Sequence, residues 1–277
     1  MSESSEAIPV PGVAVRVAPR VERLLAPNAG AWTFEGTNTW LIGSPDAAHC
    51  AVIDPGPADT AHLDSIVAAA GRRTVTEIVL THGHNDHADG AHALAERTKA
   101  TVLAQREVFG RTPIEHLQRI VLAGHVMARV LGTPGHTRDS VCLSLPDDGV
   151  VLTGDTLLGA GSPVVHPALL SEMIESLCML AEIGHGGSVI GLPGHGPVIT
   201  DLEAAALHRV SARRRRIEQV AALRDSGTTE IEDLVAAMYR HIEDPDVLKA
   251  AHSSVESMVV FLDSDLGAAA KDSGRGR

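Results

Sequence analysis

Four potential metal ligands lie within six residues of this sequence, and no other feature constrains the fold as strongly. The segment reads Thr81-His82-Gly83-His84-Asn85-Asp86-His87 and stands between a short apolar run and a stretch with helical spacing. His82 and His84 are two positions apart, so an extended backbone points both side chains to the same side. Asp86 and His87 follow at the turn into the expected helix. Imidazole and carboxylate groups at this spacing indicate a site for a first-row transition metal.

Three later segments share one design, in which an apolar run ends in a glycine-containing turn that is followed by a single ligand. They are Thr133-Pro134-Gly135-His136-Thr137, Thr153-Gly154-Asp155-Thr156 and Leu192-Pro193-Gly194-His195-Gly196. Loops at strand ends are where α/β folds place functional groups. One loop histidine alone is most often a solvated side chain. That interpretation does not account for seven ligands at four expected strand ends: His82, His84, Asp86, His87, His136, Asp155 and His195.

The distribution of apolar residues predicts alternating strands and helices. Expected strands cover 13–17, 39–42, 50–53, 77–80, 101–104, 126–131, 140–145, 150–152 and 189–192, and expected helices cover 59–70, 87–99 and 168–183. Such a mixture is typical of a layered α/β or α+β domain. Hydrophobic residues make up 44% of the 277 residues and aromatic residues only 2%, so the core must consist mainly of Ala, Val, Leu and Ile.

The pattern changes after residue 200. One apolar stripe at helical spacing predicts a first helix there, with Leu207, Val210, Ile217 and Val220 on the same side. Thr229 and Glu232 match a capping box that would open a second helix toward residue 240, and Pro245 would begin a third. We therefore predict a ligand-bearing domain over 1–200, a small helical unit over 201–266 and a disordered tail over 267–277.

Charge and cysteine content exclude several classes of protein. A net charge of −12 gives no general attraction to nucleic acid or to an anionic membrane. Cys50, Cys142 and Cys178 form no disulfide framework, which predicts reduced thiols in a cytoplasmic protein, with the first two buried in apolar runs. The acidic N-terminus lacks the pattern of a signal peptide. No apolar run reaches the ~18 residues of a membrane span.

Together, the motifs His-x-His-x-Asp-His, Thr-Pro-Gly-His-Thr, Gly-Asp-Thr and Gly-His-Gly resemble those of the metallo-β-lactamase superfamily over about residues 13–200. The resemblance implies the αββα sandwich of that superfamily and two divalent metal ions. It also assigns the ligands in two groups, with His82, His84 and His136 on the first ion, Asp86, His87 and His195 on the second, and Asp155 bridging them.

A centre of this kind is typical of hydrolases. Two cations hold a bridging water and lower its pKa toward ~7, so that a hydroxide forms and attacks a carbonyl carbon or a phosphorus. Asp86 would also orient this nucleophile, which makes it the expected catalytic residue. Imidazole and carboxylate ligands suit Zn, Fe and Mn, and zinc is the default by affinity order.

The branch of the superfamily decides the expected substrate. Asp155 stands where zinc β-lactamases usually have Cys or Ser, which argues against antibiotic hydrolysis. Homoserine-lactone lactonases place a tyrosine between the bridging aspartate and the last histidine, whereas the only tyrosine here is Tyr239. Glyoxalase II thioesterases share the Thr-His-x-His-x-Asp-His and Gly-Asp-Thr-Leu patterns, although the match to their C-terminal helices is weak.

The nearest resemblance is to the group called β-lactamase-like protein two, which includes an endoribonuclease. It rests on Gly-Thr-Asn-Thr-Trp at 36–40, Pro-Gly-His-Gly-Pro-Val at 193–198, and His208-Arg209 followed by Arg213. It implies a winged-helix-like form for 201–266. Met173 departs from the group, because an aromatic residue is expected at that position.

Three functions stand as alternatives. The first is a phosphodiesterase that acts on single-stranded RNA, and the second is a small-molecule thioester or ester hydrolase similar to glyoxalase II. The third, a non-catalytic metal-binding protein, would require an incomplete ligand set. The negative charge and the few aromatic residues count against RNA. Expected substrate contacts are Asn38, His166, Arg209 and Arg213. The run 213–216 is either a solvated, ion-paired helix or a phosphate or interface site, and a homodimer is a further alternative.

Overall fold

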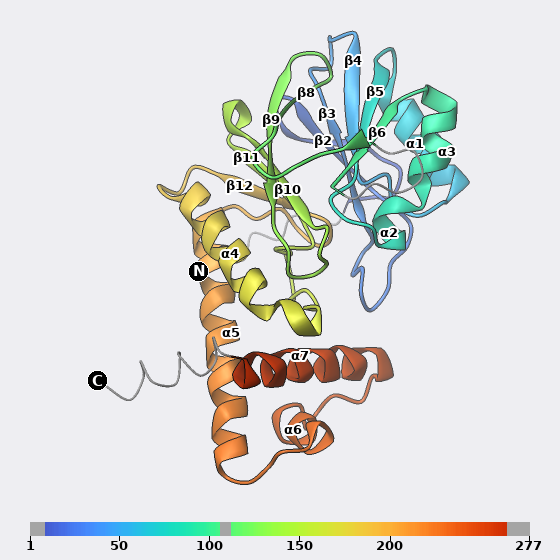
Figure 1. The fold of residues 1–277 in the computed structure, drawn as a ribbon. Coiled ribbons are helices and arrows are strands. Elements are labelled where there is room, and N and C mark those ends of the chain that lie inside the picture. The colour runs from blue at the N-terminus through green and yellow to red at the C-terminus, as the bar shows by residue number, and fades with distance from the viewer. Residues whose placement is uncertain (1–8, 106–111, 265–277) are drawn as a thin grey trace.

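The computed structural model describes residues 9–105 and 112–264 and consists of two stacked β-sheets with helices on their outer faces (Figure 1). The first sheet has the order β1 (Val15–Ala18), β2 (Val21–Leu25), β3 (Asn38–Ile42), β4 (His49–Ile53), β5 (Thr74–Val79), β6 (Thr101–Ala104) and β7 (Thr112–Pro113). Its first four strands pair antiparallel, and the strands from β4 to β7 pair parallel.

The second sheet has the order β12 (Ile190–Pro193), β11 (Val150–Gly154), β10 (Val141–Leu145), β9 (Val126–Gly132) and β8 (Arg119–Leu122). The pair of β11 and β12 is parallel, and the other pairs are antiparallel. Aliphatic side chains from the two sheets meet in a fully buried core, for example Ile42 and Ile53 from the first and Val130 and Leu143 from the second. This layer removes the apolar faces of both sheets from water.

Helices α1 (Thr60–Ala70) and α3 (Gly90–Thr98) cover the first sheet, and α4 (Leu170–Gly184) and α5 (Leu202–Asp225) cover the second (Figure 1). The αββα sandwich that the motifs imply is therefore confirmed. Helix α1 begins where the sequence predicts it, because the Asp59 carboxylate accepts a hydrogen bond from the backbone N–H of His62 at 2.7 Å. It ends at Gly71, whose φ of 63° suits glycine.

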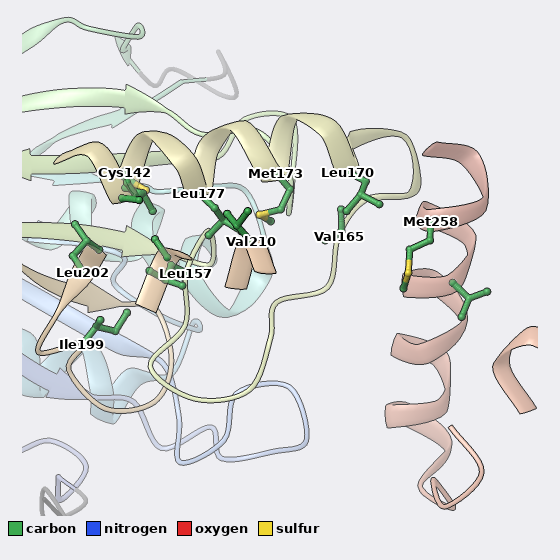
Figure 2. Packing of buried hydrophobic residues seen from close by; sticks show 14 of the residues in the cluster. Cys142, Leu157, Val165, Leu170, Met173, Leu177, Ile199, Leu202, Val210 and Met258 are labelled. Carbon is green, nitrogen blue, oxygen red and sulfur yellow. The ribbon is translucent and has the colours of Figure 1, made fainter. Parts of the chain in front are cut away.

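The C-terminal helices α5, α6 (Ile231–Met238) and α7 (Pro245–Asp263) share a single hydrophobic cluster with α4. Figure 2 shows Leu177 of α4, Val210 of α5 and Met258 of α7 among the buried side chains of this cluster. Three helices are thus present after residue 200, as expected. Between residues 201 and 264 there is no strand, so the described part of this unit has no wing. The division of the chain at residue 200 stays a prediction, and the tail over 267–277 lies outside the described residues.

Several elements differ from the sequence predictions. Strands β2, β7 and β8 were not expected, because they are short, with two to five residues each, and their sequences do not alternate regularly between apolar and polar residues. The helix expected over 87–99 consists of α2 (Asn85–Ala88) and α3. Leu207 is 47% exposed and lies off the apolar stripe of α5.

The capping box does not form. Glu230 occupies the N-cap of α6 without a side-chain cap bond, and the Thr229 hydroxyl instead donates to the Glu230 carboxylate at 3.4 Å. No helix of the described ranges combines the length and apolarity that crossing a membrane requires.

Candidate metal centre

Four strand ends meet at one edge of the sandwich and bring the seven predicted ligands together. The segment 82–87 follows β5, with His84 as the extended residue just before α2. His136 follows β9, Asp155 follows β11 and His195 follows β12. Both sheets therefore contribute to a single cluster, as the design of the four motifs predicts.

Within this cluster the nitrogen and oxygen atoms face one another in two groups. In the first, Nδ1 of His84 lies 3.1 Å from Nε2 of His82 and 2.8 Å from Nε2 of His136. In the second, Nε2 of His195 lies 3.2 Å from Nε2 of His87 and 3.2 Å from Oδ2 of Asp86. These are the two groups that the family resemblance assigns.

Asp155 stands between the two groups. Its Oδ2 lies 3.7 Å from Nε2 of His136 and 3.4 Å from Nε2 of His195, while its Oδ1 lies 3.5 Å from Nε2 of His87. Oδ1 is buried and has no hydrogen-bond partner. A carboxylate that reaches both groups has the geometry of a bridging ligand.

The outer nitrogens of three imidazoles are fixed by acceptors. Nδ1 of His136 donates to the carbonyl oxygen of Val164 at 2.7 Å, and Nδ1 of His195 donates to that of Gly36 at 3.2 Å. Nδ1 of His87 donates to the carboxylate of Asp54 at 2.9 Å. Because these oxygens only accept, each neutral ring presents a lone pair on Nε2. The lone pairs of His87 and His195 then face each other, an arrangement that a cation between them would satisfy.

The electrostatics of the cluster also favour cations. Burial opposes charge on His87 and His195, yet carboxylates, chiefly Asp155, raise the pKa of His87 well above its usual value and that of His195 to about 9. Burial also opposes ionisation of Asp155, but the two imidazoles hold its pKa well below the usual range. Burial and then the charge of His87 lower the pKa of His82. The donor set therefore suits divalent cations and attracts positive charge.

Asp54 belongs to this centre and was not among the predicted residues. Its carboxylate accepts bonds from the backbone N–H of Thr81 at 2.8 Å, from the Thr81 hydroxyl at 2.7 Å and from His87. It is buried and has a φ of 50°, in the left-handed region. A related signal was present in the sequence, because Asp54 directly follows an apolar strand and precedes the turn Pro55-Gly56, whereas the three turns with a single ligand have the glycine before the ligand.

A second hydrogen-bond network joins the turns of His136 and Asp155. The hydroxyls of Thr133 and Thr156 lie 2.9 Å apart, and the Thr133 hydroxyl lies 3.3 Å from the sulfur of Cys142. Burial raises the pKa of the Cys142 thiol to about 11, so this cysteine is a neutral packing group, as expected.

Three of the four expected substrate contacts lie near the centre or its cavity, and the fourth, Arg209 on α5, is not among the residues that line the cavity. Asn38 is buried, and its amide nitrogen donates to the carbonyl oxygens of Pro193 and Gly196, each at 3.0 Å, which holds the loop of His195. His166 lines the cavity beside the centre. Arg213 donates from Nη2 to the carbonyl oxygen of Pro163 at 3.0 Å, next to that cavity. Burial and then the charge of Arg209 lower the pKa of Arg213 to about 10.

A cavity of about 850 Å³ opens on the cluster. His84, Asp86, His136, Asp155 and His195 face it from one side. The segment 31–34, the segment 162–166 and the N-terminal half of α7 form its other walls. Met173 is fully buried against Gly135 and is not among the lining residues. The cavity has the size of a site for a small organic substrate.

Comparison with known proteins decides the family. The model of the metallo-beta-lactamase superfamily matches residues 32–216. The chain belongs to this superfamily. A similar solved structure is that of a beta-lactamase domain protein from Burkholderia ambifaria, with a TM-score of 0.82, 19% identity and coverage of 94% of this chain and 90% of that one. A metallo-beta-lactamase family protein from Thermus thermophilus has a TM-score of 0.72, 22% identity and coverage of 88% and 93%.

Curated relatives correct the expected branch. An atrochrysone carboxyl ACP thioesterase of Aspergillus chevalieri is 31% identical over 278 residues, which covers 95% of this chain and 87% of that protein. Another of that name, from Aspergillus terreus, is 31% identical over 242 residues, with coverage of 81% and 73%. The superfamily assignment from the motifs is confirmed. The expectation that the endoribonuclease group is nearest is wrong, because these relatives are named thioesterases.

Proposed function

We propose that this protein is a metal-dependent thioester hydrolase. The observation that carries the proposal is the 31% identity with a named thioesterase over 95% of the chain. It reverses the order of the sequence predictions, in which single-stranded RNA stood first and a thioester second. The comparisons support neither RNA nor a homodimer.

The seven clustered side chains are the proposed ligands of two divalent cations, with zinc as the first candidate. When bound, these cations would supply an activated water and polarise the carbonyl of the substrate. Asp86 lines the cavity, which supports the proposal that its carboxylate accepts a hydrogen bond from the attacking water. The Nδ1 bonds of His87, His136 and His195 would orient these rings toward the cations.

The cavity favours a compact acyl substrate over a polynucleotide. Apolar atoms form most of its walls, and Lys249 is the one lysine or arginine among the described lining residues. A polynucleotide site requires several cations along the phosphate backbone. Arg213 is proposed to act indirectly, because its guanidinium holds the wall at Ser162 and Pro163 through bonds of 3.3 and 3.0 Å.

The metal proposal is tested by elemental analysis of protein purified without chelator, with about two ions per chain expected. Asp155→Asn should lose at least one of them, since its carboxylate balances both cations. Asp64→Asn is the matched control, because Asp64 is an exposed carboxylate paired only with Arg97. One ion per chain in the wild type would contradict the two-metal proposal.

Activity is tested on a panel of acyl thioesters, a lactone and labelled single-stranded RNA. We expect turnover of thioesters that Asp86→Asn reduces by about a hundredfold or more, as expected for loss of a positioned proton acceptor. Cleavage of RNA that the same variant abolishes, with the thioesters left intact, would contradict the proposal. RNA cleavage equal in wild type and variant would indicate a contaminating nuclease.

A further inference from the structure

Aromatic side chains are scarce in this chain, and two of them line the cavity. The sequence has three phenylalanines, two tryptophans and one tyrosine, and two of these six, Trp32 and Phe34, line the cavity that opens on the metal centre. Trp32 is 44% exposed, whereas Trp40 is 2% exposed in the core. A large apolar side chain that stays exposed beside a reactive centre indicates a contact for a ligand.

The loop that carries Trp32 is rigidly built. It connects β2 to β3. The side-chain amide of Asn28 donates a hydrogen bond to the Thr37 hydroxyl and accepts one from the Thr37 backbone N–H, each at 2.9 Å, and these bonds close the loop. A turn at its tip is held by the backbone N–H of Gly30, which donates to the carbonyl of Phe34 at 3.0 Å. These bonds define the backbone of the loop on both sides of Trp32.

Phe34 packs the same loop against Gly161, which precedes the cavity wall formed by residues 162–166. Its φ of 53° lies in the left-handed region, which is costly for a bulky residue. Its ring packs on Gly161, where a Cβ atom would lie 2.7 Å from Cζ of Phe34. The ring thus joins the loop to the segment that follows the Asp155 turn. Strain of this kind at a cavity wall is typical of a functional position.

Helix α7 supplies the wall that faces the loop. Figure 1 shows the connection between β2 and β3 extending from the sandwich toward the N-terminal end of α7, and Val247 and Ala250 of this helix line the cavity together with Trp32. Val247 is 38% exposed. The hydroxyl of Ser253 donates to the carbonyl oxygen of Val165 at 3.3 Å and ties α7 to the third wall.

We propose that Trp32 determines acyl specificity, by stacking its indole on a flat aromatic acyl group whose thioester carbonyl lies at the metal centre. This inference rests on the proposed thioesterase function. An indole face gains more from an offset-stacked π system than from an aliphatic chain of equal area. Val247 and Ala250 cover the opposite side of the acyl group, and the cavity of about 850 Å³ accommodates both an aryl group and the thioester.

The test uses the full-length, metal-loaded protein and acetyl, octanoyl and 4-nitrobenzoyl thioesters of one thiol. Trp32→Ala should lower kcat/KM for the 4-nitrobenzoyl thioester by about tenfold or more, mainly through KM, and for the acetyl thioester by less than about twofold. Trp32→Phe should recover part of the loss. Val121→Ala, which shortens an exposed side chain on β8, is the matched control. Metal content should be unchanged in all three variants.

A binding measurement separates this inference from the proposed function. In the wild type, 4-nitrobenzoate should quench tryptophan emission, because Trp32 is exposed and Trp40 is buried. Trp32→Ala should abolish the saturable quenching. Equal losses for octanoyl and 4-nitrobenzoyl thioesters, or no quenching in the wild type, would overturn the aromatic assignment while thioester turnover stands. If the wild type turned over no thioester, the proposed function would fail, and the quenching would still decide the role of Trp32.

Discussion

At the scale of single residues, the centre depends on side chains that hold the ligands as much as on the ligands. Asp54 is the clearest example, because its carboxylate accepts bonds from His87 and twice from Thr81. The asparagine amide can accept hydrogen bonds at its oxygen only, so Asp54→Asn should release the His87 ring from the bond that orients it. We expect metal affinity at the second group to fall about 10–100-fold, measured by competition with a chelator. Retention of wild-type affinity would contradict this role.

His62 gives a prediction about pH that does not involve the ligands. It is 1% exposed, and its Nε2 donates to the Thr39 hydroxyl at 3.0 Å, since that hydroxyl itself donates to the backbone carbonyl oxygen of Asp54. Its Nδ1 is buried without a partner. Burial, with a smaller opposing effect of Asp59, lowers its pKa from 6.5 to about 4. His62 therefore binds a proton less readily in the folded state than in the unfolded state.

This difference should destabilise the protein in acid. Above pH 6.5 neither state binds the proton, and the stability is intact. As the pH falls from 6.5 to about 4, protonation stabilises the unfolded state, and the free energy of unfolding falls by roughly 3 kcal/mol, at about 1.4 kcal/mol for each pH unit. His62→Gln should remove this part of the pH dependence, measured as the difference between the two proteins in denaturant titrations. Parallel profiles for both proteins over that range would show that the His62 pKa is not lowered.

The seven predicted ligands stay a prediction, but their gathering at one place could be expected from local sequence patterns. Four of the candidate ligands stand within six residues after one apolar run, and each of the other three directly follows an apolar run and a glycine-containing turn. The role of Asn38 could not, because its amide bonds to Pro193 and Gly196, which are far along the chain. Trp32 was missed for the same reason. It lines one cavity together with residues of α7, and nothing near it in sequence indicates that neighbour.

At the scale of elements, the turns at the strand ends leave no room for larger side chains. Gly194, just after β12, lies so close to the centre that a Cβ atom would overlap Oδ1 of Asp155 and lie 2.7 Å from Cε1 of His87. Gly194→Ala should therefore displace two ligands from different turns. We expect loss of most of the bound metal with the far-UV circular dichroism retained.

Gly30→Ala is the matched control, because a Cβ atom there would meet only the Thr33 hydroxyl at 3.4 Å. This variant should keep its metal. Wild-type metal content in Gly194→Ala would mean that the backbone of the turn after β12 can shift without displacing Asp155.

Elements were predictable where their apolar pattern is regular. Helix α1 was found at its N-cap because Asp59 precedes a clear apolar stripe. Strand β2 was missed because its buried Leu24 and Leu25 adjoin the polar pair Glu22-Arg23, which breaks the alternation. The capping box predicted at Thr229 did not form, because its hydroxyl bonds to the neighbouring Glu230 carboxylate instead of to the helix backbone. A motif of four residues does not exclude such a competing bond.

At the scale of the whole molecule, the hydrophobic cluster crosses the division expected at residue 200. It runs from Leu131 and Val151 of the second sheet through Leu180 of α4 to Met258 of α7. Figure 2 shows Met258 on α7 facing the region of Val165 and Leu170. Shared burial of this kind couples the stability of the packed parts. We therefore expect the sandwich and the C-terminal helices to unfold in one transition.

Met258→Ala tests this coupling, because it removes a buried side chain from α7 and should cost about 2–5 kcal/mol. Trp32 shares its cavity with α7, whereas Trp40 is buried in the sandwich, so the measurement uses a Trp32→Phe background in which Trp40 emission reports on a part of the chain that lacks the substitution. If the molecule unfolds as one unit, the transition seen by tryptophan emission and the one seen by helical circular dichroism shift together. Val121→Ala, on the exposed side of β8, should change stability by less than about 0.5 kcal/mol. A Met258→Ala protein whose helices melt first, with tryptophan emission unchanged, would show that residues after 200 fold as a separate domain.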